Sequence, residues 1–272
     1  MPDLALLLPL LAALSLIGAF AGVVGGLLGV GGGIVLVPAF FYAFGQLGYG
    51  GDQLMQVGVA TSMATIVVTS LRSVSAHNRR GAVDWTVLKT WGPTLVIAAA
   101  VGTFVAGQVS SLTLQAVFGA LAGLAGLWMA FGRDHWRLGT AMPGQPTRSA
   151  LAAAVGLFSA MMGIGGGTFG VPLMTLYGLP IHRAVATASG FGVLIAVPSV
   201  LGFLLLPVTN APPWTIGAVN LPAFLVVIGT TLLTTPLGVR LAHSMNPRPL
   251  KRAFALFLTL VALNMLRKVL GW

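Results

Sequence analysis

Residues 26–38 read GLLGVGGGIVLVP. The run holds a cluster of glycines at Gly29, Gly31, Gly32 and Gly33. The surrounding stretch, residues 4–44, contains no Lys, Arg, Asp or Glu. Glycine costs about 1 kcal/mol relative to alanine inside a helix, so three successive glycines favour a turn within an apolar helical segment. Irregular backbone at membrane depth persists only where it is buried in protein or faces a watery cavity. The run therefore predicts a site inside a membrane.

The composition of the whole chain is that of a membrane protein. Of its 272 residues, 57% are hydrophobic and 7% are charged, and the mean hydropathy is +0.97. Soluble domains carry about 25% charged residues. The apolar segments lie at 4–44, 57–76, 87–107, 113–131, 150–177, 184–206, 221–241 and 250–271. Most of them approach the ~20 residues needed to cross a bilayer, so we predict an all-α polytopic membrane protein.

Basic residues outnumber acidic ones, with 14 Lys and Arg against 4 Asp and Glu and a formal net charge of +10. Because most basic residues lie at segment ends, they indicate contacts with the lipid bilayer that set the topology, and not a nucleic-acid surface. The chain has no Cys, which excludes disulfides and thiolate metal sites. The apolar N-terminal stretch has no Lys or Arg before it, and we interpret it as part of the mature fold.

The glycine run occurs twice. Its second copy is SAMMGIGGGTFGVP, which begins at Ser159 and contains Gly163, Gly165, Gly166 and Gly167. A second motif follows each copy, VATS at residues 59–62 and VATAS at residues 185–189, and a weaker match pairs Gly102 with Gly238. The chain is therefore predicted to consist of two homologous halves.

We place the two transmembrane repeats at residues 4–131 and 150–271, joined by a cytoplasmic linker at residues 132–149. Cytoplasmic loops concentrate Lys and Arg, so the basic residues bear on how the halves are oriented. If all eight segments span, a set of basic residues falls outside: Arg183, Arg240, Arg248, Lys251 and Arg252. If both glycine-bearing segments are re-entrant, each half has an odd number of full spans and the second half is inverted. Only Arg267 and Lys268 then fall outside, which favours inverted repeats.

Segment length supports the re-entrant hairpin. Residues 150–162 and 168–177, on either side of the second glycine run, are each too short to cross the membrane but long enough to reach its midplane. A single broken span is the alternative, and the longer first-half segment leaves it more open there. The predicted fold thus has broken or re-entrant glycine-rich helices that meet near the midplane.

The glycine runs predict a binding site for an anion. A helix that begins after Gly33 or Gly167 aims free backbone N–H groups and the positive end of its dipole at the break. Two such ends near the midplane make an anion site without a charged side chain. The predicted site glycines are Gly31, Gly32, Gly33, Gly165, Gly166 and Gly167. The alternative is close helix packing through small residues, whereas a phosphate-binding loop would need a strand and a GK[ST] ending that the chain lacks.

A polar stripe follows in VATSMATIVVTSLR, residues 59–72. On a helix, its polar members share an arc of about 80°: Thr61, Thr65, Thr69 and Arg72. Such a stripe suits a lined pathway, although Ser and Thr also bond to the preceding turn and a terminal Arg can snorkel to the surface. The second half offers only Thr187 and Ser189, and Arg183 at the start of that segment either gathers anions or anchors the helix.

Acidic residues and histidines are sparse. The aspartates lie at the terminus, in loops or at segment margins: Asp3, Asp52, Asp84 and Asp134. The histidines lie scattered at segment ends: His77, His135, His182 and His243. The sequence therefore predicts no metal site, no proton relay and no cofactor. No Ser-His-Asp set and no pair of carboxylates falls on helix faces that could meet, so the chain is not expected to be an enzyme.

With VATS and VATAS, the paired motifs GLLGVGGGIVLVP and MMGIGGGTFGVP resemble the TauE/SafE sulfite exporter family of bacterial membrane transporters. The resemblance covers nearly the whole chain. It implies a multi-pass protein of the bacterial cytoplasmic (inner) membrane that moves sulfite or small organosulfonates, usually outward. Besides the glycines, the family motif falls on Pro38, Thr61, Ser62, Pro172 and Thr187. The chain departs from the family at Ala60 and Ala186, where glycine is frequent.

We therefore expect a secondary transporter for a small sulfur-containing anion. The anion would be held between two half-helix ends, with hydroxyls from Thr61, Ser62, Thr187 and Ser189. Without a proton carrier the protein could run as a uniporter, since an interior-negative potential favours anion exit by about 2.3 kcal/mol per charge per 100 mV. The alternatives are a gated anion channel, a Na⁺- or H⁺-coupled uptake carrier, and a non-transporting membrane partner for assembly or sensing.

Overall fold

A computed structural model describes residues 4–131, 136–244 and 248–271 of the chain. Asp3, Asp134 and His135 lie outside the described residues. Within the described ranges the chain forms ten helices and one two-stranded antiparallel sheet. In order these are α1 (Leu4–Leu28), α2 (Gly33–Gln46), α3 (Leu54–Asn78), α4 (Trp85–Gln108), α5 (Ser111–Phe131), α6 (Thr147–Met162), α7 (Gly167–Leu176), α8 (Ile181–Leu204), β1 (Thr215–Ile216), β2 (Val219–Asn220), α9 (Leu221–Ser244) and α10 (Arg248–Val269). The fold is all-α, as predicted.

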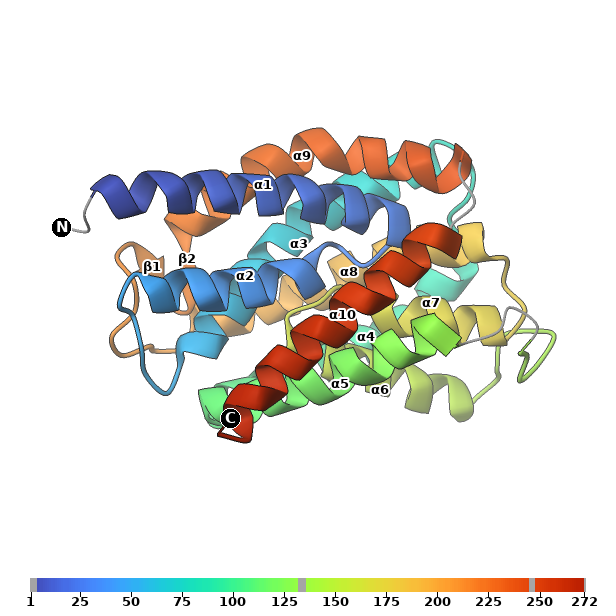
Figure 1. Cartoon of the computed structure of the whole chain (residues 1–272). Coiled ribbons are helices and arrows are strands. Elements are labelled where there is room, and N and C mark those ends of the chain that lie inside the picture. The colour runs from blue at the N-terminus through green and yellow to red at the C-terminus, as the bar shows by residue number, and fades with distance from the viewer. Residues whose placement is uncertain (1–3, 132–135, 245–247, 272) are drawn as a thin grey trace.

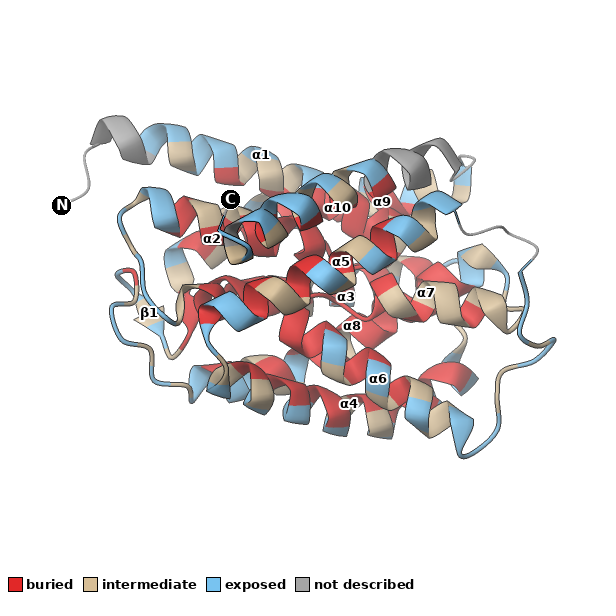
Figure 2. Cartoon of the chain, turned by 60° about the horizontal axis from the view of Figure 1, so that its bottom comes forward, coloured by how far each residue is buried: buried red, intermediate tan, exposed pale blue. Residues whose placement is uncertain are grey.

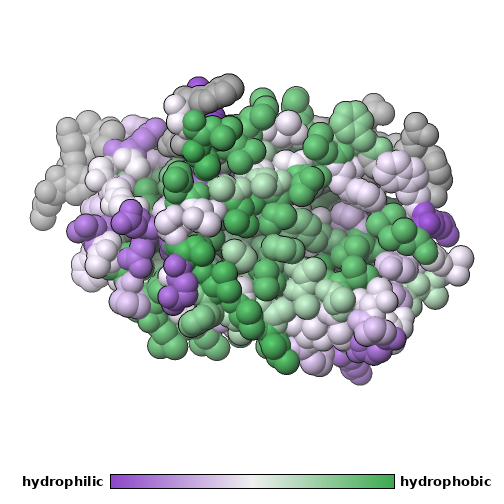
Figure 3. Space-filling view, turned by 90° about the horizontal axis from the view of Figure 1, so that it is seen from below, coloured by the Kyte–Doolittle hydropathy of each residue, from purple (hydrophilic) through white to green (hydrophobic). Residues whose placement is uncertain are grey.

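Most of the helices run roughly along the long axis of the bundle, and α10 crosses it obliquely (Figure 1). Among the described residues, six helices are long and apolar enough to cross a membrane: α1, α3, α4, α5, α8 and α9. Shorter apolar helices are α2, α6, α7 and the Ala255–Arg267 part of α10. Figure 3 shows apolar residues across the middle of one face and polar residues gathered at both ends of the axis. This distribution is the one that a bundle presents to a bilayer.

The first five helices and the last five pack as two copies of one pattern. Helix α1 lies against α9, and its counterpart α6 lies against α4. The counterparts α3 and α8 lie against each other, as do α5 and α10. The first helix of each half therefore packs on the fourth helix of the other half, so the two repeats are interlocked.

Glycines in equivalent positions allow this interlocking. A Cβ added to Gly238 of α9 would meet the carbonyl oxygen of Val23 in α1, and one added to Gly102 of α4 would meet that of Leu157 in α6. Close helix packing through small residues explains both positions. The weaker sequence match between the halves thus marks a helix contact and not a binding site.

The two halves run in opposite directions. Helix α2 turns back toward the end of the bundle where α1 begins (Figure 1). Helix α7 turns back toward the linker that precedes α6, where the N–H groups of Leu138 and Gly139 donate to the carbonyl oxygen of Leu176 at 2.8 and 3.3 Å. The hairpins α1–α2 and α6–α7 start from opposite ends of the bundle (Figure 1). This is the inverted arrangement that the distribution of basic residues predicts.

We call the end that holds β1 and β2 the sheet end, and the end that holds linker residues 136–146 the linker end. Helices α3 and α8 form the centre of the bundle (Figure 2). In their most apolar stretches, 78% of α3 and 67% of α8 is buried, against 33–44% of the other candidate spans. The two helices that carry the VATS and VATAS motifs are therefore shielded from lipid by the rest of the protein.

Candidate functional site

Each glycine run forms the turn between a long helix and a half-helix. In the first run Gly29, Gly31 and Gly32 have φ angles of 69°, 70° and 81°. In the second run Gly163 has a φ angle of 69°. Residues with a Cβ rarely adopt these left-handed angles, so the turns need glycine at these positions. The predicted helix breaks are confirmed in both halves.

The two breaks lie against each other. A Cβ added to Gly33, where α2 begins, would meet the carbonyl oxygen of Gly163. A Cβ added to Gly167, where α7 begins, would meet the carbonyl oxygen of Gly29. One added to Gly165 would lie 2.9 Å from the carbonyl oxygen of Val30. Each half-helix thus begins against the break of the other half, and glycine is needed there for the close approach as well.

The N-termini of both half-helices have free donors. Neither α2 nor α7 has a side-chain cap. Within the described ranges no acceptor is found for the backbone N–H groups at the starts of these helices: Gly33, Ile34, Gly167, Thr168 and Phe169. Such N–H groups and the positive end of the helix dipole attract negative charge. The crossing of the two breaks is therefore suited chemically to an oxyanion.

Thr61 and Thr187 occupy equivalent positions and accept equivalent hydrogen bonds. The backbone N–H of Asn220 donates to Oγ1 of Thr61 at 3.0 Å, and that of Asp84 donates to Oγ1 of Thr187 at 2.9 Å. The side chains of Asn220 and Asp84 in turn accept bonds from the first turns of α9 and α4. Each threonine therefore joins a central helix to the start of a helix from the other half.

The two predicted serines hold the centre of the bundle together. The hydroxyl of Ser62 donates to the carbonyl oxygen of Gly163 at 2.8 Å, which ties α3 to the second break. The hydroxyl of Ser189 lies 2.9 Å from that of Ser73 and 3.2 Å from the carbonyl oxygen of Val185. Both serines are buried. Their contacts are to protein atoms at or beside the crossing of the repeats.

The polar stripe on α3 is buried, but it does not end as expected. Thr65 donates to the carbonyl oxygen of Thr61 at 3.0 Å, and Thr69 donates to that of Gly31 at 3.2 Å. Arg72 is exposed and does not continue the buried row. The row continues at the same four-residue interval through two buried residues that were not predicted to belong to it, Ser73 and His77. That interval, which runs unbroken from Thr61, is the signal that could have found them.

Three of the histidines meet at the linker end. Nδ1 of His77 lies 3.1 Å from Nε2 of His243, and Nε2 of His77 lies 3.2 Å from the carbonyl oxygen of Gly26. The ring of His243 stacks on that of His182 with centroids 6.0 Å apart. The expectation of scattered histidines is wrong for these three, because α3, α8 and α9 bring their ends together. No group of residues that could hold a metal ion is found in the described ranges.

Arg183 forms an ion pair at the linker end. One of its guanidinium nitrogens lies 3.0 Å from Oδ2 of Asp84, and its side chain is 49% exposed against 17% for the aspartate. Exposed ion pairs add little stability, about 0–1 kcal/mol. The pair holds the start of α8 beside that of α4, and its charges neutralise each other.

Three further hydroxyls that were not predicted as site residues are buried near the breaks. Ser70, Ser159 and Thr168 are 1%, 0% and 7% exposed, and their oxygens have no hydrogen-bond partner in the described part of the chain. About 90% or more of buried polar groups in proteins have a partner, so orphaned hydroxyls are unusual. All three lie in the helices that form or surround the glycine breaks.

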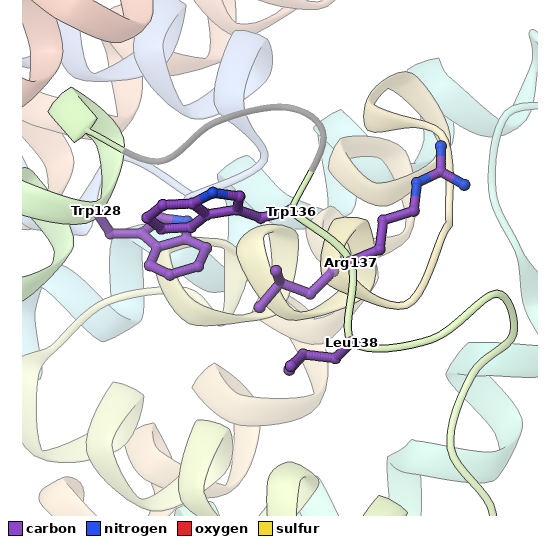
Figure 4. Close-up of a pocket in the computed structure, with 5 residues that line it drawn as sticks. Trp128, Trp136, Arg137 and Leu138 are labelled. Carbon is purple, nitrogen blue, oxygen red and sulfur yellow. The ribbon is translucent and has the colours of Figure 1, made fainter.

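A surface depression of about 540 Å³ lies at the linker end, where α5 and α7 finish (Figure 4). It is lined by Trp128, Trp136, Arg137, Leu138 and Leu176. The two indole rings meet edge to face with centroids 5.6 Å apart. Tryptophans collect at membrane–water interfaces because their rings are amphipathic. The position and lining suit an interfacial anchor and not the anion site.

Comparison with known proteins agrees with this architecture. The family model described as sulfite exporter TauE/SafE matches residues 14–265. A probable membrane transporter protein of Haemophilus influenzae is 30% identical over 256 residues, which cover 93% of this chain and 97% of that protein. One of Methanocaldococcus jannaschii is 25% identical over 265 residues, 97% of each chain.

A shorter stretch of 134 residues, 48% of this chain, is 35% identical to 21% of the probable membrane transporter protein MamO of Magnetospirillum gryphiswaldense. No solved structure matches the chain. The first two matches run the length of the bundle, and the names are those of transporters and not of enzymes. The chain therefore belongs to the TauE/SafE sulfite exporter family and is a membrane transporter.

Proposed function

We propose that the protein exports a small sulfur-containing anion, sulfite or an organosulfonate, and that the anion binds where α2 and α7 begin. One observation carries the proposal: two uncapped half-helix N-termini lie against each other's breaks. The family's description as sulfite exporters supports the choice of anion and the outward direction.

Backbone donors suit a site at this depth. A charged side chain near the middle of a bilayer is costly, whereas helix N-termini offer positive potential without a formal charge. Several N–H groups can bond separate oxygens of one sulfonate or sulfite. Inverted repeats that interlock around a midplane site are the architecture in which one half can rock against the other and expose the site to either side.

The membrane potential is sufficient to drive export. By the positive-inside rule, the linker end is cytoplasmic, since Arg79, Arg80 and Arg183 lie at that end. An interior-negative potential favours exit of a monovalent anion by about 2.3 kcal/mol per 100 mV, roughly a fiftyfold gradient. The contact between His77 and His243 favours a second candidate, in which a proton accompanies the anion.

The proposal can be tested with two alanine variants in liposomes loaded with sulfite. Gly167→Ala places a Cβ against the carbonyl oxygen of Gly29, whereas Gly229→Ala, in α9, meets nothing within 4 Å. With an imposed potential we expect efflux from the wild type and from Gly229→Ala, and strongly reduced efflux from Gly167→Ala.

Wild-type efflux in Gly167→Ala would contradict the location of the site. A folded wild-type protein that moved neither sulfite nor methanesulfonate, at any pH gradient, would contradict the choice of anion.

A further inference from the structure

Ser70 of α3 brings a hydroxyl to the crossing of the two breaks. A Cβ added to Gly31 in the first break would lie 3.2 Å from Oγ of Ser70, and one added to Gly192 of α8 would touch that oxygen. The Cα of Gly192 in turn lies 3.4 Å from a Cβ added to Gly165 in the second break. The hydroxyl of Ser70 therefore lies beside the first break and is separated from the second by one glycine.

The hydroxyl of Ser70 has no hydrogen-bond partner, unlike those of its polar neighbours on α3. The neighbouring Thr69 donates to the carbonyl oxygens of Gly31 and Thr65, and Ser73 pairs with Ser189. Serines in helices commonly donate to the carbonyl four residues earlier. Ser70 makes no such bond in the described structure and is 1% exposed. Its proton is therefore free to be donated inside the protein.

Thr168 offers a second free hydroxyl in the first turn of α7. Its side chain is 7% exposed and its Oγ1 has no partner within the described ranges. Its backbone N–H is one of the free donors of that helix. The equivalent residue of the first half is Ile34, which is fully buried and apolar. A polar side chain at this position is thus particular to the second break.

We propose that Ser70 and Thr168 are direct ligands of the transported anion, each donating its hydroxyl proton to one oxygen. This inference rests on the proposed function, because it names side-chain ligands for that same anion. The ligand class is an oxyanion with at least two acceptor oxygens, which the backbone N–H groups of α2 and α7 bind together with these hydroxyls. Ser70 beside the first break and Thr168 in the first turn of α7 are both buried without a hydrogen-bond partner, and each acquires one when the anion binds.

The opposing explanation is that both hydroxyls only fill space. The two explanations differ in what removal of the oxygen does. A buried hydroxyl without a partner contributes nothing favourable to folding, so removing it leaves stability unchanged or raises it in either case. The affinity for the anion falls only if the removed hydroxyl binds the anion. The variants Ser70→Ala and the isosteric Thr168→Val therefore separate binding from packing.

The experiment measures the KM for potential-driven sulfite efflux and the thermal unfolding midpoint of each variant in detergent. Ser199→Ala is the matched control, because Ser199 is also buried in a central helix but donates to the carbonyl oxygen of Ile195 at 2.8 Å. A hydrogen bond to a charged group corresponds to about tenfold to a hundredfold in affinity. We expect KM to rise by that factor in Ser70→Ala and Thr168→Val, with unfolding midpoints no lower than that of the wild type.

Direct binding gives an independent readout. Added sulfite or methanesulfonate should raise the unfolding midpoint of the wild type and of Ser199→Ala, and about tenfold more anion should be needed for the same rise in the two ligand variants. Wild-type KM and wild-type stabilisation in both ligand variants would overturn the inference while leaving the proposed function intact. A wild type that neither transports nor is stabilised by these anions would overturn the proposed function, and the inference would fall with it.

Discussion

Nδ1 of His77 lies 3.1 Å from Nε2 of His243, and the other ring nitrogen of His77 faces the carbonyl oxygen of Gly26 at 3.2 Å. These contacts tie α3 to α9 and to α1 at the linker end. A carbonyl oxygen only accepts, so Nε2 of His77 carries a proton. Nδ1 of a neutral His77 then accepts a hydrogen bond from His243.

This geometry limits the protonation of the pair. The bond between the rings persists when both are neutral or when only one of them is charged, but not when both are charged, because the two facing nitrogens then both carry hydrogen. The ring of His182 from α8 stacks on that of His243. Arg80, in the loop after α3, places its positive charge near the rings of His77 and His243. Asp84 of α4 is paired with Arg183, and the described part of α1 has no titratable side chain.

We expect acidification at the linker end to open this contact and raise flux. Methanesulfonate is the suitable substrate, since it stays ionised between about pH 7 and pH 3. The doubly charged pair forms only in the lower part of this range, because burial of both rings and the positive charge of Arg80 disfavour it. Flux through the wild type should rise across this range, and flux through His77→Gln should not. His182→Gln is the control and should retain the pH dependence. An identical pH profile in the wild type and His77→Gln would exclude the pair as the sensor.

The hydrogen bonds of Thr61 and Thr187 predict a loss of stability on removal. Thr187→Val leaves the backbone N–H of Asp84 without its acceptor, and Thr61→Val does the same to Asn220. An unsatisfied buried donor costs about 1–3 kcal/mol, so both variants should unfold at lower temperature than the wild type. Thr90→Val is the control, because Thr90 is exposed and bonds only within its own helix. Equal midpoints for all three variants would show that these bonds do not stabilise the contact between the halves.

The ion pair between Arg183 and Asp84 predicts a small effect of charge removal. Arg183→Gln should change the KM for sulfite by less than about twofold and the stability by less than about 1 kcal/mol, as exposed pairs do. If Arg183 gathers anions at the mouth of a pathway, the same variant should raise KM strongly at low salt and weakly at high salt. Transport measured at two ionic strengths separates these outcomes.

The overall architecture could be predicted from local patterns. Repeated glycines at Gly29 and Gly163 predict helix breaks, because backbone angles near 70° are costly for other residues. The lengths of the flanking segments and the distribution of basic residues predict inverted hairpins, and both halves contain them. These features depend on neighbours in sequence or on the membrane, so no knowledge of tertiary contacts is needed.

The side chains around the breaks depend on tertiary contacts. A helical arc of 100° per residue places Arg72 on the face of Thr61 and Thr69, yet Arg72 is exposed and Ser73 is buried. The face of α3 that is buried is set by the neighbouring α2 and by α8 and α9, two helices from the other half of the chain. The meeting of His77 with His243 has the same origin. No local pattern reports how two repeats interlock.

The glycines of the helix contacts predict a phenotype distinct from that of the glycines at the breaks. A Cβ added to Gly238 would meet the carbonyl oxygen of Val23, at the contact between α9 and α1. Overpacking of this kind costs about 1–3 kcal/mol, so Gly238→Ala should lower the unfolding midpoint. The folded fraction should bind and transport sulfite with wild-type KM, because this contact lies outside the breaks.

Gly33→Ala supplies the comparison, since its Cβ would meet the carbonyl oxygen of Gly163 and separate the two half-helix ends. We expect it to raise KM in the protein that remains folded, whereas Gly238→Ala should not. Gly229→Ala, with open space around its Cβ, should match the wild type in KM and gain up to about 1 kcal/mol in stability. Unchanged KM in all three variants would mean that both kinds of glycine serve only helix packing, and the anion would then have to bind elsewhere in the bundle.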